Sequence, residues 1–387
     1  MSRPSGIQQG ELSVTLPGPH PRLDRVPAAL VDRVRLTVSC RDADAIPKVE
    51  GAGEVVVRDG VTVQVMHNGV VIEEGSYHGA WMTEIIRSLR GHHEPQEELV
   101  FDRIVRRLQA DRAHPPTMIE FGSFWGYYSL WFAHEFRDAR IVAMEPDPEC
   151  MRAGVRNAAL NKLESQVDFV AGAIGSRPGE QLDFVSELDG SVHRVVQHDL
   201  GSLMTSTDLD RVDVVLADVQ GAETILLERG RGVLADGRVR FLIVSTHHHS
   251  ISGDPLTHQH ALRLLTDLGA HVIAEHSVTE SYSGDGLIAV SFDDRDAQFR
   301  VPISHARAKE SLFGELEPEI AAQMRRAAAA EDLAASLGGQ LEAARNERDE
   351  ARAERDTAIA EMDAVHRTKL WRWAGPPRQV YDRLRSR

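Results

Sequence analysis

Cysteine is scarce in this chain of 387 residues: only Cys40 and Cys150 occur, far apart and without metal-ligand spacing. Two cysteines are too few for a disulfide scaffold and fit a reducing compartment. Long apolar runs are missing too, since no window approaches the ~18 apolar residues of a membrane-spanning helix. The amino-terminal residues lack the apolar core of a signal peptide. We therefore expect a cytoplasmic protein.

Positive charge is also in short supply. The chain has 44 Lys and Arg side chains against 59 Asp and Glu, which gives a formal net charge of −15. An acidic surface repels a phosphate backbone, so the composition argues against nucleic-acid binding. Hydrophobic residues nevertheless make up 42% of the sequence, enough for a large buried core. The expected class is one large α/β domain with accessory segments.

Residues 117–145 organise the chain. Two short apolar runs, residues 118–121 and 141–144, flank a glycine turn and a helical pattern over residues 127–136. This order predicts two parallel strands joined by a crossover helix. The second strand stops at Glu145, before a turn.

The glycine turn indicates which nucleoside the unit binds. A dinucleotide fingerprint that starts at Gly122 would need glycine at positions 124 and 127, which hold Phe124 and Tyr127. S-adenosylmethionine has no phosphate, so a turn with bulky residues between Gly122 and Gly126 can still wrap its methionine and ribose. Glu145 is then placed to bind the ribose hydroxyls. The unit favours an S-adenosylmethionine site over a nicotinamide site.

The following residues continue the alternation of strands and helices, which predicts a doubly wound, Rossmann-like sheet over residues 91–312. The last two strands are expected to close the sheet as an antiparallel pair. The predicted strands are 167–173, 212–217, 240–245, 272–275 and 286–292, and the predicted helices include 94–109, 148–161, 222–228 and 258–268.

Four flanking segments differ in composition. Residues 1–34 are polar and proline-rich, which predicts a disordered arm, and residues 35–90 predict a β-rich extension that ends in a helix. Residues 313–367 are helical in composition, with Gly338 and Gly339 expected to interrupt the helix. Residues 368–387 form a basic, aromatic tail.

The helical segment has the spacing of a coiled coil, alternating steps of three and four residues. A dimeric coiled coil and a single solvated helix both remain open, because two arginines weaken the seam. The seam positions are Leu337, Leu341, Ala344, Arg348, Ala351, Arg355, Ala358, Met362 and Val365.

The runs IEFGSFWGYYSLWFA, VAMEPDP, VAGAIGS, VDVVLADVQGAE and FLIVSTHHH, in this order, resemble the FkbM family of S-adenosylmethionine-dependent O-methyltransferases over residues 90–292. The resemblance implies a class I methyltransferase sheet and an acceptor hydroxyl on a sugar or a polyketide-type metabolite. This chain departs from the family at the fifth strand, where residues 245–249 read STHHH. The implied cofactor-binding residues are Glu120, Gly122, Ser123, Gly126, Glu145 and Ala173.

Asp218 is the first candidate for the catalytic group, because it ends the fourth strand beside the ligand crevice of an open sheet. It could act as a general base or bind a metal that acidifies the hydroxyl, and His247 is the second candidate. Alternatively, Asp218 caps the following helix. A metal site formed by Asp218, Glu223 and His247 is the less favoured interpretation. His92 and His93 could line the cleft or belong to a solvated helix cap.

The tail resembles the Trp-Arg and Pro-Leu-Arg tail of bacterial glycan-modifying enzymes, with Pro377 where leucine is usual. We therefore expect the acceptor to be a sugar in a bacterial glycan or glycosylated metabolite. The tail could dock on a glycan-assembly enzyme or on the inner face of the membrane, and the helix could form a homodimer. The alternative functions are a non-catalytic scaffold that retains the fold and, less favoured, a nicotinamide oxidoreductase.

Overall fold

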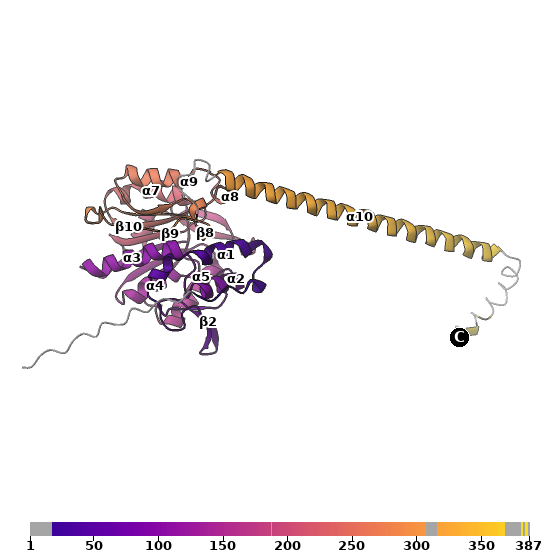
Figure 1. Cartoon of the computed structure of the whole chain (residues 1–387), viewed down its shortest axis with the longest axis horizontal. Coiled ribbons are helices and arrows are strands. Elements are labelled where there is room, and N and C mark those ends of the chain that lie inside the picture. Colours follow the sequence, from indigo (N-terminus) through magenta and orange to yellow (C-terminus); the bar gives the residue numbers. More distant parts are fainter. Residues whose placement is uncertain (1–17, 187, 307–315, 368–380, 382–383, 386–387) are drawn as a thin grey trace, which may run out of the picture. The chain divides into compact units, whose positions relative to one another are not determined.

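The computed structural model describes residues 18–186, 188–306, 316–367, 381, 384 and 385, with the backbone alone for residues 316–322. Two compact units make up the chain, Met1–Gly314 and Glu315–Arg387. In the first unit, helices cover both faces of a twisted sheet, and the second unit contains one long helix (Figure 1). No helix in the described ranges combines the length and apolarity that crossing a membrane requires.

A nine-stranded sheet, counted over the described residues, runs through the first unit. Its strands are β4 (Thr117–Phe121), β5 (Arg140–Glu145), β6 (Val167–Ile174), β7 (Gln181–Val185), β8 (Val192–His198), β9 (Val212–Ala217), β10 (Val239–Thr246), β11 (His271–His276) and β12 (Gly286–Ser291). The order is β11-β12-β10-β9-β4-β5-β6-β8-β7. Strands β10, β9, β4, β5, β6 and β8 are parallel, and β12 is antiparallel to both β10 and β11. The predicted fold class and the antiparallel closing pair are confirmed.

Each central strand is buried on both faces, which explains its continuous apolar run. Met118 packs into one hydrophobic cluster and its neighbour Ile119 into the other, because successive side chains point to opposite faces. Helices α3, α4 and α5 cover the first face, while α6, α7 and α9 cover the second (Figure 1). Their bounds are α3 (Pro95–Asp111), α4 (Tyr127–Glu135), α5 (Pro148–Asn161), α6 (Leu200–Ser206), α7 (Glu223–Ala235) and α9 (Thr257–Asp267).

The amino-terminal extension contains a small antiparallel sheet of β1 (Val55–Arg58), β2 (Val61–Val65) and β3 (Val71–Glu73). Side chains of α5 complete the free edge of β3. The Val71 amide donates to Asn161 Oδ1 at 2.9 Å, and the Glu73 amide donates to Asn157 Oδ1 at 2.8 Å. The extension is therefore joined to the main unit through helix α5.

Two predictions for the amino-terminal region are wrong. The β-branched run at residues 36–40, expected to begin the β-rich extension, lies in helix α1 (Val31–Ser39) and its cap, because Val34 and Thr37 are buried at helical spacing. The arm predicted over residues 1–34 is ordered from residue 18, and Val26 packs into the main core. Residues 1–17 lie outside the described residues. The helix that ends the extension is α2 (Ala80–Ser88).

The second unit is described through helix α10 (Leu316–Arg367), which is 52 residues long. It continues through Gly338 and Gly339, so the predicted interruption is wrong. Every described side chain of α10, residues 323–367, is exposed. Most of the basic, aromatic tail, including Pro377, lies outside the described residues.

Candidate active site

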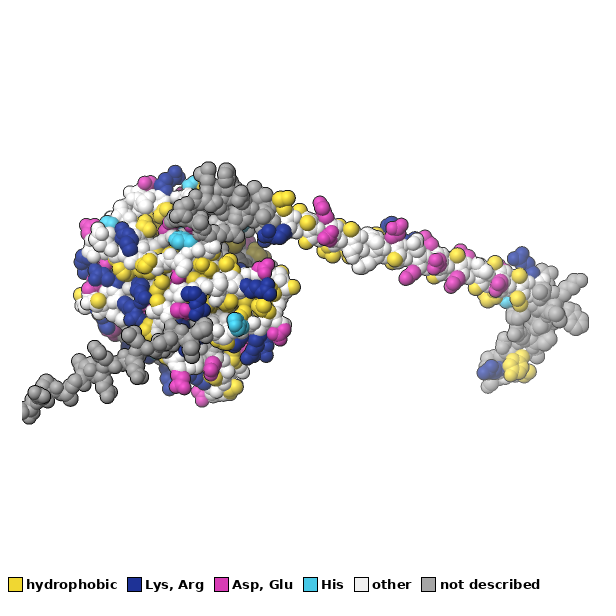
Figure 2. Space-filling model, in the orientation of Figure 1, with side chains coloured by type: hydrophobic (Ala, Val, Ile, Leu, Met, Phe, Trp, Pro, Cys, Tyr) yellow, Lys and Arg dark blue, Asp and Glu magenta, His cyan; other side chains and the backbone are white. Residues whose placement is uncertain are grey.

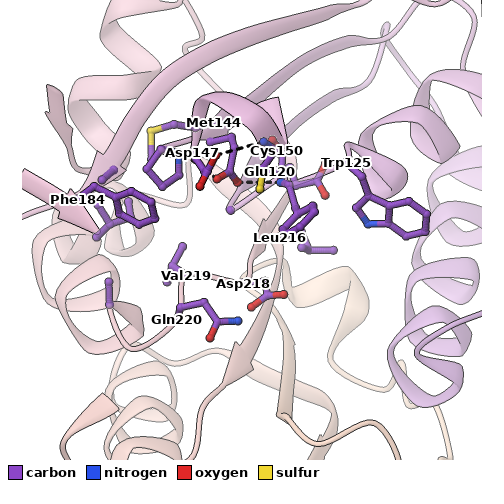
Figure 3. Close-up of a pocket in the computed structure, with 18 of the residues that line it drawn as sticks. Glu120, Trp125, Met144, Asp147, Cys150, Phe184, Leu216, Asp218, Val219 and Gln220 are labelled. Atoms are coloured by element: carbon purple, nitrogen blue, oxygen red, sulfur yellow. Dashed lines mark hydrogen bonds between the residues drawn. The ribbon is translucent and has the colours of Figure 1, made fainter. Parts of the chain in front are cut away.

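A cavity of about 460 Å³ opens at the carboxyl edge of the parallel strands. The chain runs from β4 outward to β8 and then returns to β9 on the other side of β4, and ligands bind at such a reversal of strand order. Figure 3 shows Trp125 and Phe184 at opposite ends of the cavity, while Asp218 and Gln220 face Glu120 across it. This cavity is the candidate active site.

The turn after β4 touches the end of β9. Gly122 has a φ of +74°, and a Cβ there would lie 1.7 Å from the carbonyl oxygen of Asp218. The Asp218 amide donates to the Phe121 carbonyl at 2.9 Å. Position 122 therefore requires glycine both for its backbone conformation and for this close approach. Gly126, with a φ of +75°, is the residue from which α4 begins.

Glu120 is buried at the end of β4 and lines the cavity. Its Oε2 accepts hydrogen bonds from the Ser129 amide, at 2.9 Å, and from the Ser129 hydroxyl. Burial raises the pKa of Glu120 to about 8, although the bonds from Ser129 oppose this shift. The carboxyl group thus fixes the first turn of α4 while it faces the cavity.

Glu145 holds the turn after β5 and also lines the cavity. Its two carboxylate oxygens accept from the backbone amides of Phe124, at 2.8 Å, and Asp147, at 2.9 Å. Burial raises the pKa of Glu145 to about 7. Each oxygen has a second lone pair, so the group can hold the backbone and still accept from a ligand hydroxyl.

Ser123 and Ala173, two of the expected cofactor-binding residues, both line the cavity. The Ser123 hydroxyl is buried and has no hydrogen-bond partner within the described part of the chain. A buried polar group without a partner is costly, which points to a ligand that supplies the missing bond. Ala173 lies within β6, beside Gln197 of β8, and not in a loop.

Asp218, His247 and Glu223 form an array at the ends of β9 and β10. Asp218 Oδ1 lies 3.1 Å from His247 Nε2 in an ion pair without hydrogen-bond alignment, and Glu223 Oε1 hydrogen-bonds to the other ring nitrogen, Nδ1. Burial lowers the pKa of His247, but the carboxylates of Asp218 and Glu223 outweigh it and raise the pKa to about 11. His247 is therefore an imidazolium at neutral pH.

This array decides between the interpretations left open by the sequence. Asp218 is not the cap of α7, because that helix begins after Ala222 and has no side-chain cap. Asp218 and Glu223 approach opposite nitrogens of His247, so the three side chains do not converge on one metal position. His248, the next residue, is half-buried and accepts from the Ser250 amide through Nδ1.

The sequence analysis missed several residues that line the cavity. Tyr77 and His78, from the segment before α2, form part of its wall, and the Tyr77 ring stacks on Trp125 with centroids 4.6 Å apart and planes 6° from parallel. Asp285, on the loop before β12, is not a lining residue, but its Oδ1 lies 3.7 Å from His247 Nε2. None of these residues belongs to a periodic pattern or a motif, so only the aromatic character of residues 77–78 gave a signal.

His93 also lines the cavity, which confirms the cleft interpretation for this residue, whereas His92 is not among the lining residues. The solvated cap is wrong. Both histidines are buried. His93 Nδ1 lies 2.7 Å from Glu98 Oε1, and Nε2 lies 3.3 Å from Glu94 Oε2. Burial opposes the charge on His93, but these two carboxylates raise its pKa to about 10. His92 instead pairs with Glu98 through Nδ1, away from the cavity.

Within the described residues, one set of side chains has the spacing of metal ligands: His67, His92 and Glu98, all buried. The rings of His67 and His92 stack with centroids 4.3 Å apart and planes only 19° from parallel. Ring nitrogens coordinate in the plane of the imidazole, so the lone pairs of stacked rings do not converge. His67 Nδ1 also hydrogen-bonds to Tyr127 Oη at 2.9 Å. The stacked rings thus lack the convergent lone pairs of a metal site, although His92 Nε2 is buried without a hydrogen-bond partner among the described residues.

Comparison with known proteins finds one family model that is similar to part of this chain. Residues 113–272 match the sequence profile of the methyltransferase FkbM domain. No curated protein matches the chain. One similar solved structure is the METTL16 methyltransferase domain, at 15% identity over 52% of this chain and 69% of that chain, with a TM-score of 0.34. Another is precorrin-6y C5,15-methyltransferase from Geobacter metallireducens, at 16% identity over 50% of this chain and 88% of that chain, with a TM-score of 0.32. The ribosomal protein L11 methylase from Lactobacillus delbrueckii subsp. bulgaricus is similar at 15% identity, over 52% of this chain and 80% of that chain, with a TM-score of 0.31.

These structural likenesses are weak, whereas the profile match spans the strand-turn-helix unit around Gly122, Glu145 and the strand end at Asp218. Over residues 113–272 this chain is therefore similar to the methyltransferase FkbM domain.

Proposed function

We propose that this protein is an S-adenosylmethionine-dependent O-methyltransferase whose acceptor is a hydroxyl of a sugar in a bacterial glycan or glycosylated metabolite. The position of the Asp218 side chain in the cavity is the observation that carries the proposal. Its carboxylate lines the cavity, and its Oδ1 lacks an aligned hydrogen bond within the described residues, although His247 lies beside it. A group held in this way can accept the proton of an incoming hydroxyl.

The cavity lining fits S-adenosylmethionine. Glu145 would accept from the ribose hydroxyls, Glu120 would face the cationic methionine part, and the unpaired Ser123 hydroxyl would gain a partner. When bound, the cofactor supplies an electrophilic methyl group on a positively charged sulfur. Two carboxylates in a largely buried cavity favour a ligand with positive charge.

Asp218 would hold the acceptor hydroxyl and take its proton as the hydroxyl oxygen forms the new bond to carbon. His247 is not suited to take this proton, because its pKa of about 11 leaves both ring nitrogens protonated at neutral pH. We therefore assign His247 as a positioning residue that fixes the Asp218 carboxylate. Glu223 in turn fixes the ring of His247 from the opposite side.

The end of the cavity near Trp125 suits a sugar. Tyr77 and Trp125 supply an aromatic wall, while Glu94 and Asp218 supply hydrogen-bond acceptors at its edge. A sugar ring has apolar C–H faces and hydroxyls around its rim, which matches such a wall with polar groups beside it.

A non-catalytic scaffold is the rival function. A buried imidazolium between two carboxylates costs desolvation energy and contributes little net stability, and the ion pair with Asp218 lies at the cavity. A fold retained only for scaffolding has no need of this arrangement. The array therefore favours turnover.

Gene deletion followed by mass spectrometry of surface glycans tests the proposal. The expected result is the loss of one CH₂ mass per methyl group, restored by the wild-type gene but not by the Asp218→Asn variant. Glycans of unchanged mass would reject the acceptor class. Restoration by Asp218→Asn would reject the assigned base.

Chelation separates the base from a metal. Purified enzyme treated with EDTA and then dialysed is expected to keep its activity on glycans from the deletion strain. Inactivation that a divalent ion reverses would overturn the general-base assignment of Asp218.

A further inference from the structure

Among the described residues, helix α10 carries a stripe of exposed apolar side chains. Leu337, Leu341, Ile359 and Met362 lie on one side of the helix, and each is between 48% and 57% exposed. Figure 2 shows hydrophobic side chains along the helix among acidic ones. Isolated helices gain most of their stability from packing of such a face, so a solvated stripe over several turns calls for a partner.

We propose that α10 pairs with α10 of a second copy of this chain in a parallel, in-register, two-stranded coiled coil. The stripe follows a heptad repeat with Leu341, Arg348, Arg355 and Met362 at the a positions. The d positions hold Leu337, Ala344, Ala351 and Ala358. This repeat gives the left-handed geometry in which a and d side chains face a partner helix.

The charges beside the stripe select a second copy in parallel orientation. The g positions are Gln340, Glu347, Glu354 and Glu361, and the e positions are Arg345, Arg352 and Ile359, so one charged pair of g and e residues forms in each direction across the dimer. In a parallel dimer, g of one helix faces e of the next heptad of its partner, so Glu347 meets the partner's Arg352. In an antiparallel dimer, g faces g and e faces e, which opposes like charges.

The two arginines at a positions fit the same arrangement. In a parallel dimer each lies beside a g-position glutamate of the partner, Arg348 beside Glu347 and Arg355 beside Glu354. Their heads already turn outward, toward Asp349 and Asp356, at 2.8 Å and 2.6 Å. The methylene stems can then cover the seam while the charges remain in water, which a two-stranded coil permits more readily than a closed, higher-order core.

An anionic membrane surface is a poorer partner for α10. The helix has twelve acidic side chains against seven basic ones. Negatively charged lipid attracts basic segments and repels acidic ones. The self-complementary pattern of g and e charges has no counterpart on a lipid surface.

Cysteine cross-linking of the full chain tests the orientation. Both native cysteines are buried, so an introduced cysteine on α10 is the accessible thiol. Ala344→Cys and Ala358→Cys, at d positions two heptads apart, should each give a disulfide-linked dimer under mild oxidation. Ala353→Cys, on the outer face, should not. An antiparallel dimer could cross-link at no more than one of these d positions, and that result would overturn the proposal.

Charge reversal tests the interface. Light scattering of the wild-type chain should give twice the 42.8 kDa mass of one chain. Glu347→Arg combined with Glu354→Arg should return the mass to that of a monomer, with circular dichroism confirming an intact core. Glu342→Arg combined with Glu350→Arg makes the same change in charge outside the seam and should remain dimeric. A monomeric wild type, or a dimer that survives the first double substitution, would reject pairing through α10.

Discussion

Asp218 Oδ1 lies 3.1 Å from Nε2 of His247, and this pair joins the ends of two neighbouring parallel strands. The register of β9 and β10 places Ala217 opposite Val244, so Asp218 and His247 extend from the same edge of the sheet. The pair gives the cavity a carboxylate whose position is fixed by a cation that cannot itself accept a proton at neutral pH.

Asp218→Asn should reduce the methyl-transfer rate by roughly 10²- to 10⁴-fold, the usual size of a general-base effect. The change keeps the shape of the side chain but removes its ability to take a proton. Affinity for S-adenosylmethionine should change little, because the cofactor contacts assigned above lie on β4 and β5. Single-turnover kinetics and calorimetry measure the two quantities separately.

The matched control is Asp236→Asn, at the exposed carboxyl end of α7. It should retain the wild-type rate. If Asp218→Asn also turned over at the wild-type rate on the true acceptor, the base would have to be sought elsewhere, with Asp285 the next carboxylate beside His247.

Glu145→Gln should weaken S-adenosylmethionine binding by about 2 kcal/mol, because it replaces charged hydrogen bonds to the ribose with neutral ones. Glutamine keeps the size of the side chain and one of the two oxygens that accept from the backbone amides, so the melting temperature of the variant should be measured beside its affinity. Glu149→Gln, exposed on α5, is the control. If calorimetry gave the same dissociation constant for Glu145→Gln and for the wild type, Glu145 would not be a cofactor-binding residue.

Binding of S-adenosylmethionine should release protons near neutral pH. In the protein without ligand, burial raises the pKa of Glu120 to about 8 and that of Glu145 to about 7, so both are partly protonated there. A cationic ligand favours the ionised forms, and affinity should therefore rise from pH 6 to pH 9. Calorimetry in buffers of different ionisation enthalpy measures the released protons. The Glu120→Gln variant should release fewer protons on binding than the wild type. Binding enthalpies that are identical in all buffers would contradict the assignment of Glu120 and Glu145 to the cofactor site.

His247 should make the protein less stable as the pH rises above neutrality. Its pKa is about 11 in the folded protein and about 6.5 when unfolded, so its contribution is complete below pH 6.5 and disappears as the pH approaches 11. Within that window its contribution to the free energy of unfolding should fall by at most about 1.4 kcal/mol per pH unit. Urea denaturation at several pH values should show a shallower decline for His247→Gln. Parallel curves for variant and wild type would show that the ring is neutral.

The sequence was sufficient to predict the strands whose apolar runs end at a charged residue or glycine. Glu120, Glu145 and Asp218 were recognised because buried parallel strands are continuous in hydrophobicity and stop abruptly at the ligand edge. Gly122 was recognised because it opens a turn between a predicted strand and a predicted helix. The bulky side chains in that turn then excluded a pyrophosphate-binding site. These signals are local, so a single sequence contains them.

The features that could not be predicted from the sequence depend on contacts between distant segments. The run at residues 36–40 has the β-branched composition of a strand, but Thr37 donates its hydroxyl to the Tyr282 carbonyl in a helix that packs on the core. Tyr77 reaches the cavity from a loop without periodicity, and Asp285 approaches His247 from another loop. The protonation of His247 depends on carboxylates that approach opposite ring nitrogens, which no residue spacing encodes.

The side chains of Asn157 and Asn161 accept hydrogen bonds from the edge of β3, where a neighbouring strand would otherwise pair. This arrangement couples local unfolding of the small sheet to that of α5. The amides of Val71 and Glu73 are protected by side chains of α5 and not by a backbone ladder. Their exchange with deuterium should therefore follow the exchange of the α5 amides, because the extension cannot detach while that helix stays intact. The small sheet and the Glu145 half of the cavity should unfold together as one cooperative unit.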